Sequence, residues 1–140
     1  MTKFYAFEDM NVWQEARSLT RIIRAICKRS NAARDFAFVD QITRSVRSIS
    51  ANIAEGSDAM TSPEFIVFLG YAKRSAAEVR SHLFDALDEK YITQEEFTSL
   101  AEECRKVQRM IASLIHHLQT LDPKLKRTFK QKQPVNQLTS

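Results

Sequence analysis

Hydrophobic residues recur every three or four positions through most of the chain, which is the period of an amphipathic α-helix. The repeat is clearest near the C-terminus, where eight apolar residues from Phe97 to Leu121 step alternately by three and by four. Three similar apolar seams precede this one. The sequence therefore predicts four helices, over about residues 10–29, 38–57, 63–89 and 94–121.

Polar residues at the expected helix starts support these boundaries. Thr93 precedes the last helix and Glu96 follows three residues later, the spacing of a capping box that satisfies free backbone N–H groups. Ser62 followed by Pro63 predicts the start of the third helix, because proline needs no N–H partner in the first turn. Asp9 is the candidate cap of the first helix.

The connections between the predicted helices are short, so consecutive helices should run in opposite directions. The chain holds only two glycines and three prolines, which is typical of a fold with few turns and long helices. Together these features predict an all-α fold, an antiparallel up-down-up-down four-helix bundle. We expect the bundle and a short N-terminal arm over residues 1–123, and a basic, flexible tail over residues 124–140, where the apolar period is lost.

Positive charge is concentrated in the first half of the chain and in the tail. The formal net charge is +4, and residues 10–53 alone carry an excess of five positive charges. Four cations of the first helix are spaced by four, three and four residues and so share one helix face. We call them the basic stripe: Arg17, Arg21, Arg24 and Lys28.

The basic stripe has two interpretations. A basic face attracts phosphate backbones with little sequence preference, and an ordinary solvated helix face gives the same pattern. No aromatic residue is interleaved with the stripe, so base stacking is not predicted there. The candidate nucleic-acid contacts are the stripe together with Arg44, Arg47, Lys124, Lys126, Arg127, Lys130 and Lys132.

Polar residues flank the apolar seams of the second and third helices at the same offset, including those of the segment SISANIAEGS (residues 48–57). Folding the hairpin about residues 59–60 places Arg44 near Glu78 and Ser45 near Ser75. These residues either fix the alignment of the two helices or line a polar ligand pocket. Gly56 either ends the second helix or lets the helices approach closely. The predicted polar network comprises Arg44, Asn52, Glu55, Ser75 and Glu78.

The run FIVFLGYA (residues 65–72) is apolar on all sides of its helix, whereas a bundle helix buries only one face. Exposed apolar surface of this kind usually contacts another protein, so the run predicts a homo-oligomer. Closure of the patch by the chain's own N-terminal aromatic residues, Phe4, Tyr5 and Phe7, is the alternative. The candidate oligomer interface comprises Phe65, Ile66, Val67 and Phe68.

The sequence contains no recognisable catalytic, metal or cofactor site. No Glu has a His three residues later, as di-iron bundles require, and no glycine-rich phosphate loop is present. Cys27 and Cys104 occupy apolar helical positions, as expected for buried free thiols. No apolar run approaches the roughly 20 residues of a membrane span, and the N-terminus has no secretory signal, so we expect a cytoplasmic protein.

Three stretches carry a resemblance to a known family: FEDMNVWQEA (residues 7–16), DQITRSVRSISANIAEGS (residues 40–57) and EFIVFLGYAKRSAAEV (residues 64–79). Together they resemble the bacterial four-helix-bundle proteins of the 23S rRNA intervening-sequence family, over residues 7–121. The resemblance implies an up-down bundle that forms a ring-like homo-oligomer, a pentamer. The hallmark polar residues of the family fall on Asn52 and Glu55, and its arginine falls on Arg44.

The chain departs from the family pattern where Glu89 and Lys90 replace the usual Leu-Gly. It is also similar to accessory bundle proteins of diversity-generating retroelements, which bind nucleic acid and a reverse transcriptase. The resemblance therefore implies three partner classes: further copies of the chain, RNA or DNA, and a reverse transcriptase or other protein. No catalytic residues are established for the family, and none are expected here.

We expect a non-enzymatic bundle that repeats a basic face around a homo-oligomer and binds nucleic-acid backbone. A protein–protein scaffold without a nucleic-acid role is the alternative. An enzyme that uses the region of Glu55 and Glu78 is a third and less favoured reading.

Overall fold

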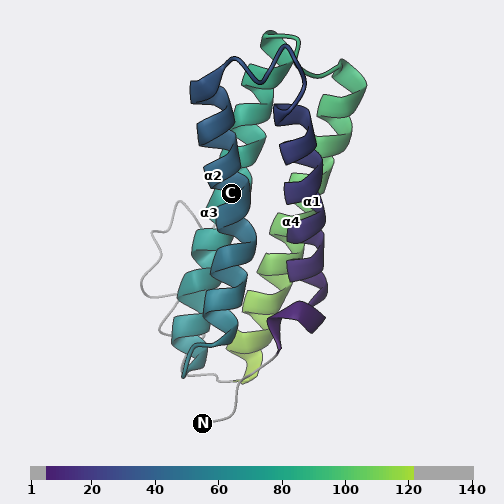
Figure 1. Ribbon diagram of the computed structural model, residues 1–140. Coiled ribbons are helices and arrows are strands. Elements are labelled where there is room, and N and C mark those ends of the chain that lie inside the picture. The colour runs from purple at the N-terminus through teal and green to yellow at the C-terminus, as the bar shows by residue number, and fades with distance from the viewer. Residues whose placement is uncertain (1–5, 122–140) are drawn as a thin grey trace.

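The computed structural model describes residues 6–121, and every regular element in this part of the chain is helical. The elements are a 3-10 turn η1 (Phe7–Asp9) and the helices α1 (Asn11–Cys27), α2 (Phe36–Ser57), α3 (Ser62–Asp88) and α4 (Gln94–Leu121). Consecutive helices run in opposite directions (Figure 1). The predicted all-α four-helix bundle is confirmed. The expected tail, residues 124–140, lies outside the described residues.

Side-chain caps fix the starts of the later helices. At α4 the predicted capping box is confirmed, because the N–H of Glu96 donates to Thr93 Oγ1 over 3.1 Å and the N–H of Thr93 donates to Glu96 Oε1 over 2.9 Å. At α3 the cap is Thr61, one residue before the predicted Ser62. Its Oγ1 accepts from the N–H of Glu64 over 3.4 Å.

The first helix begins differently from the prediction. Asp9 lies in η1, and the residue that precedes α1 is Met10, which cannot cap with its side chain. The turn η1 instead packs an aromatic pair at the helix start, where the Phe7 and Trp13 rings meet edge to face with centroids 5.1 Å apart.

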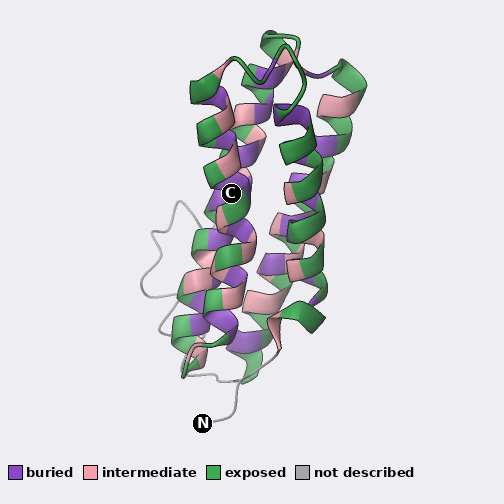
Figure 2. Cartoon of the chain, viewed as in Figure 1, coloured by how far each residue is buried: buried purple, intermediate pink, exposed green. Residues whose placement is uncertain are grey.

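The four apolar seams meet along the bundle axis, and the outward faces are exposed (Figure 2). Each fully buried Leu, Ile or Phe stabilises the fold by about 1.5–3 kcal/mol. Leu121, the last position of the α4 seam, departs from the pattern and is 63% exposed. The largest fully buried side chains are Leu19, Ile23, Ile42, Ile49, Ile53, Phe65, Leu69, Leu83, Ile111 and Leu118.

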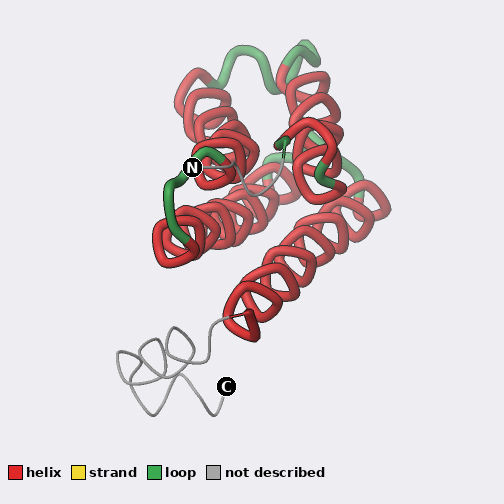
Figure 3. Tube along the Cα trace, turned by 90° about the horizontal axis from the view of Figure 1, so that it is seen from below, coloured by secondary structure: helices red, strands yellow, loops and turns green. Residues whose placement is uncertain are grey.

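The helices follow one another around the bundle in chain order, and α1 and α4 are the least closely packed neighbours (Figure 3). The bundle therefore has four faces, each at the seam between two helices. The α1/α2 face lies opposite the α3/α4 face. None of the helices between residues 6 and 121 combines the length and apolar character that crossing a membrane requires.

Gly56 brings α2 and α3 close together near their shared connection. A Cβ atom at this position would lie 2.8 Å from Phe65 Cδ1 and 3.0 Å from Phe68 Cβ. The helix α2 continues past Gly56 to Ser57, so this glycine serves the close approach of two helices rather than the end of one.

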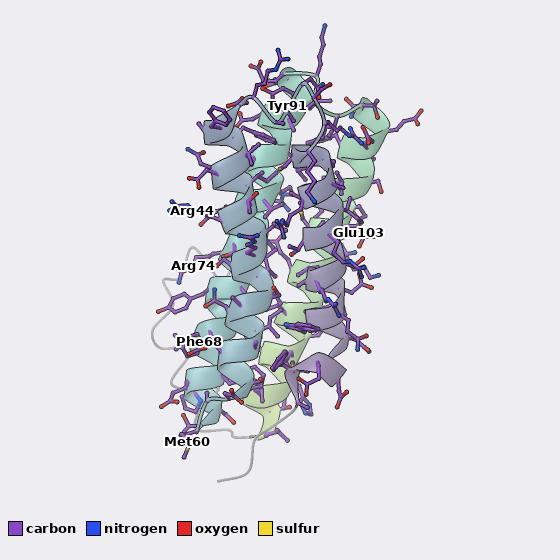
Figure 4. The ribbon with its side chains drawn as sticks, viewed as in Figure 1. Arg44, Met60, Phe68, Arg74, Tyr91 and Glu103 are labelled. Atoms are coloured by element: carbon purple, nitrogen blue, oxygen red, sulfur yellow. The ribbon has the colours of Figure 1, made fainter. Side chains whose placement is uncertain are left out.

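A cluster of polar contacts joins the α1–α2 and α3–α4 connections at the end of the bundle where Figure 4 labels Tyr91. Arg29 Nη1 donates to the carbonyl oxygen of Tyr91 over 2.9 Å and to Glu96 Oε1 over 3.1 Å. The Tyr91 hydroxyl donates to Asp35 Oδ2 over 2.7 Å, which raises the pKa of Tyr91 to about 12. These contacts tie the two connections together.

The ion pair between Arg29 and Glu96 predicts a pH-dependent part of the stability. The Arg29 guanidinium and the N–H of Thr93 lower the pKa of Glu96 from 4.5 to about 2. Because the folded value is depressed, this stabilisation is complete above about pH 4.5 and is lost as the pH falls towards 2. The Glu96 side chain is 33% exposed, so the pair contributes only about 0.5–1 kcal/mol.

Glu96→Gln should therefore lower the free energy of unfolding by that amount at pH 7 and flatten its fall between pH 4.5 and 2. Denaturant unfolding over a pH series measures both effects. The neighbouring variant Glu95→Gln is the control and should keep the wild-type profile. Identical profiles for wild type and Glu96→Gln would exclude this role of the ion pair.

Candidate nucleic-acid interface

The basic stripe lines a groove between α1 and α2 with a volume of about 450 Å³. All four of its cations are exposed. Beneath them, Thr20 Oγ1 donates to the carbonyl oxygens of Ala16 over 2.8 Å and of Val46 over 3.3 Å, which ties the two helices together below the groove. The other lining residues are Thr20, Ala25 and Ser50.

The charge of this groove is of one sign. No acidic residue lines it, and within residues 6–121 none of the stripe cations forms an ion pair. Arg17 Cζ lies 5.7 Å from the centre of the Trp13 ring, a cation–π contact that orients the guanidinium. Unpaired exposed cations in a row can bind successive phosphates.

The neighbouring α1/α4 face has the opposite character. Its groove has a volume of about 750 Å³, and four glutamates line it. Two of them are paired, Glu15 with Lys106 and Glu96 with Arg29. Glu103 is also on this face (Figure 4). The lining carries four carboxylates against two cations, Arg29 and Lys106, so this face is less favourable to a polyanion than the α1/α2 groove.

The remaining basic candidates are not all part of the α1/α2 groove. Arg47 is exposed on α2 one turn before Ser50, which lines the groove, and can extend it. Arg44 lies further round α2 and is paired with Asp40, with Nε 3.2 Å from Oδ1. The tail candidates lie outside the described residues: Lys124, Lys126, Arg127, Lys130 and Lys132.

The polar network between α2 and α3 exists, but its pairs differ from the predicted ones. Ser45 Oγ donates to Glu78 Oε2 over 3.2 Å, and Ser75 Oγ donates to Ser48 Oγ over 2.8 Å. Asn52 Nδ2 donates to the carbonyl oxygen and to Oγ of Ser48 over 2.8 and 2.9 Å. Ser45 therefore faces Glu78, not Ser75.

Two predicted members do not join the network. The pairing of Arg44 with Glu78 was wrong, because Arg44 pairs with Asp40 on its own helix. Glu55 is exposed, and its carboxylate has no hydrogen bond within the described residues. No buried side-chain nitrogen or oxygen in residues 6–121 lacks a partner, so no polar group is left aimed at a ligand. This favours the alignment role over the ligand pocket.

The close approach at Gly56 explains the shift of the pairs. Phe65 and Phe68 of α3 both lie against Gly56 of α2. With this contact in place, Ser45 meets Glu78 instead of Ser75, a shift of three residues, or about one helical turn, along α3. The sequence did show that polar flanks face one another, but only the packing of Phe65 fixes which residues meet.

The apolar run of α3 is partly buried within the chain. Phe65 is 0% and Ile66 4% exposed, so these two candidates for the oligomer interface belong to the protein's own core. Val67 is 49% exposed, and Phe68 is half-buried. The exposed surface is therefore narrower than predicted.

Two residues outside the four interface candidates extend this surface: Met60, which is 57% exposed, and Tyr71 of the same apolar run, which is 44% exposed. Tyr71 meets Phe68 edge to face with ring centroids 6.1 Å apart, and Arg74 Cζ lies 5.1 Å from the Tyr71 ring centre. Figure 4 labels Met60, Phe68 and Arg74 along one side of the molecule. Val67 and Tyr71 are four residues apart, so the sequence alone indicates that they lie on the same helix face. We call Met60, Val67, Phe68 and Tyr71 the α3 patch.

The cysteines are unsuited to nucleophilic catalysis. Both are free and buried, and burial raises the pKa of Cys27 and raises that of Cys104 to about 12. No group of three potential metal-binding side chains of His, Cys, Asp or Glu occurs within residues 6–121.

Comparison with known proteins places the fold among related bundles. A family model described as 23S rRNA-intervening sequence protein matches residues 8–113. A solved structure of a Bacteroides thetaiotaomicron protein of unknown function, from the S23 ribosomal protein family, is similar with a TM-score of 0.68. The two chains are 28% identical, and the match covers 74% of this chain and 97% of that one. No curated protein matches the sequence.

Proposed function

The chain belongs to the 23S rRNA-intervening sequence protein family, and we propose that it is a non-enzymatic nucleic-acid-binding bundle. Copies assemble through the α3 patch into a ring-like homo-oligomer, and the α1/α2 groove of each copy binds the backbone of RNA or DNA. A pentamer is the ring size that the family resemblance implies, and a reverse transcriptase is the corresponding protein partner.

The α1/α2 groove carries the proposal. Four unpaired cations along about 16 Å of one helix, with no acidic residue among the lining residues, form a row of positive charge that can contact several phosphates of a nucleic-acid backbone. Such contacts are individually weak. Repeating the groove around a ring raises the overall affinity, because each further contact forms at a high effective concentration.

A protein–protein scaffold without a nucleic-acid role is the second candidate, and the α3 patch favours it. An exposed apolar strip is as suitable for a foreign protein as for a second copy. A protein scaffold would not use the α1/α2 groove. Nucleic-acid binding that depends on the groove cations would therefore favour the first candidate over the scaffold.

Charge reversal in the α1/α2 groove tests the proposal. Arg17→Glu combined with Arg21→Glu should weaken binding to all nucleic-acid sequences by a similar factor, because phosphate contacts carry no sequence information. The slope of log affinity against log salt should become shallower by about 2. Fluorescence anisotropy with two unrelated duplexes measures both quantities.

The matched control is Lys90→Glu, which reverses an exposed cation at the end of the bundle, outside the groove. It should change the affinity far less than the double variant does. Equal losses in the control and the double variant would contradict a specific role for the α1/α2 groove.

A further inference from the structure

The α3/α4 face, opposite the basic stripe, carries a second cationic groove that the sequence did not reveal. The groove has a volume of about 320 Å³ and is open to solvent. Its cations come from two helices, Lys73 from α3 and Arg105 and Arg109 from α4. The other lining residues are Gln108 and Ala112.

The two sides of this groove are fixed to each other at its floor. Gln108 Nε2 donates to the carbonyl oxygen of Lys73 over 3.4 Å. Gln108 Oε1 accepts from Arg80 Nη1 over 3.1 Å. Arg80 lies two helical turns beyond Lys73 on the same face of α3, so this line of contacts follows the α3/α4 seam.

An exposed aromatic ring continues the same seam. Phe84 lies one turn beyond Arg80 and is 53% exposed. Its ring packs against Phe97 of α4, with centroids 4.7 Å apart and planes inclined by 60°. The contact holds the ring in place from one side. From Lys73 to Phe84 the seam is about 16 Å long at 1.5 Å per residue.

We propose that the α3/α4 groove binds single-stranded nucleic acid, with phosphates at Lys73, Arg105 and Arg109 and an unpaired base stacked on Phe84. A cationic track with an aromatic platform is the combination by which proteins hold single strands. The α1/α2 groove has no aromatic lining residue and suits a backbone alone. This second site lies on the opposite face and does not depend on the first.

Glu102 limits the charge of the α3/α4 groove. Its Oε1 lies 2.8 Å from Arg109 Nη2 and its Oε2 lies 4.0 Å from Arg105 Nη1. Arg109 lowers the pKa of Glu102, so the carboxylate is ionised at neutral pH. Exposed pairs of this kind are weak, and an incoming phosphate can replace the carboxylate. Removal of this carboxylate should therefore strengthen binding, an effect that misfolding cannot imitate.

Fluorescence anisotropy with a short oligo(U) and with the oligo(A)·oligo(U) duplex tests the second site in the full chain. Phe84→Ala should weaken single-strand binding by about fivefold to 100-fold and leave duplex binding nearly unchanged. Lys73→Glu should also weaken single-strand binding, and Glu102→Gln should strengthen it. Circular dichroism checks that each variant keeps the wild-type helix content.

Phe84→Leu separates stacking from packing, because leucine keeps an apolar contact with Phe97 but has no ring. We expect it to lose as much single-strand binding as Phe84→Ala. Recovery of binding with leucine, unchanged binding with alanine, or no gain with Glu102→Gln would each overturn the second site. Variants of Arg17 and Arg21 should retain single-strand binding, so failure of either groove is seen independently of the other.

Discussion

Gly56→Ala is expected to lower the free energy of unfolding by about 1–3 kcal/mol, although alanine is the better helix former. The added Cβ would lie 2.8 Å from Phe65 Cδ1, and the Phe65 ring is fully buried and cannot rotate away without disturbing the core. It would also lie 3.0 Å from Phe68 Cβ, an atom fixed to the backbone of α3. The two helices would have to separate.

Gly70→Ala is the matched control in the same hairpin. A Cβ at Gly70 meets nothing within 4 Å, so this variant should gain up to about 1 kcal/mol from helix propensity alone. Denaturant unfolding followed by circular dichroism measures both variants. If Gly56→Ala proved as stable as Gly70→Ala, the close approach of α2 and α3 would not require a glycine.

Val67→Glu combined with Tyr71→Glu is expected to convert the proposed homo-oligomer into monomers. Both side chains are about half exposed in the single chain, so the fold of the protomer should tolerate the change. In an assembled interface, each carboxylate would be buried without a partner, at a cost of about 3–5 kcal/mol. Light scattering coupled to gel filtration gives the mass of wild type and variant at micromolar concentration.

Ile22→Glu is the control for this variant, because Ile22 is 45% exposed but lies on the α1/α4 face, away from the α3 patch. Ile22→Glu should leave the mass measured for the wild-type protein in solution unchanged. A wild-type protein that is already a monomer, or an Ile22→Glu variant that dissociates equally, would refute assembly through the α3 patch.

The helices and their inward faces could be predicted from the sequence because the signal is local. The period of three and four in α4 identifies its buried seam, and Thr93 with Glu96 identifies its start. The basic stripe was equally predictable, since its four cations follow one another along a single helix. Each of these inferences uses only residues of a single helix and its first turn.

The remaining features depend on contacts between helices, which periodicity does not encode. The repeat of three and four in α3 passes through Phe65 and Leu69, but every residue from Phe65 to Phe68 is apolar, so the pattern does not tell how much of the run beyond Phe65 is buried. The structure buries Phe65 and Ile66 and exposes Val67. The α3/α4 groove was missed for a similar reason, because Lys73 and Arg109 are distant in sequence and meet only across a seam.

The distribution of charge suggests how one protomer can have two separate binding faces. Cationic grooves lie at the α1/α2 and α3/α4 seams, and the α1/α4 seam between them is lined by glutamates. The acidic face should keep a bound backbone from spreading from one groove to the other. On the fourth face, between α2 and α3, Phe68 of the α3 patch lies against Gly56, so an assembly built through that patch would use a different face from the two cationic grooves.

Salt dependence of duplex binding tests the central claim most directly. The affinity of the wild-type protein for a short duplex of unrelated sequence should fall with salt at a log–log slope of about −3 or steeper, as expected when the four stripe cations neutralise phosphates. The affinity should be similar for a second sequence. Absence of binding at low salt, or a slope near zero, would contradict the account and leave the protein scaffold as the function.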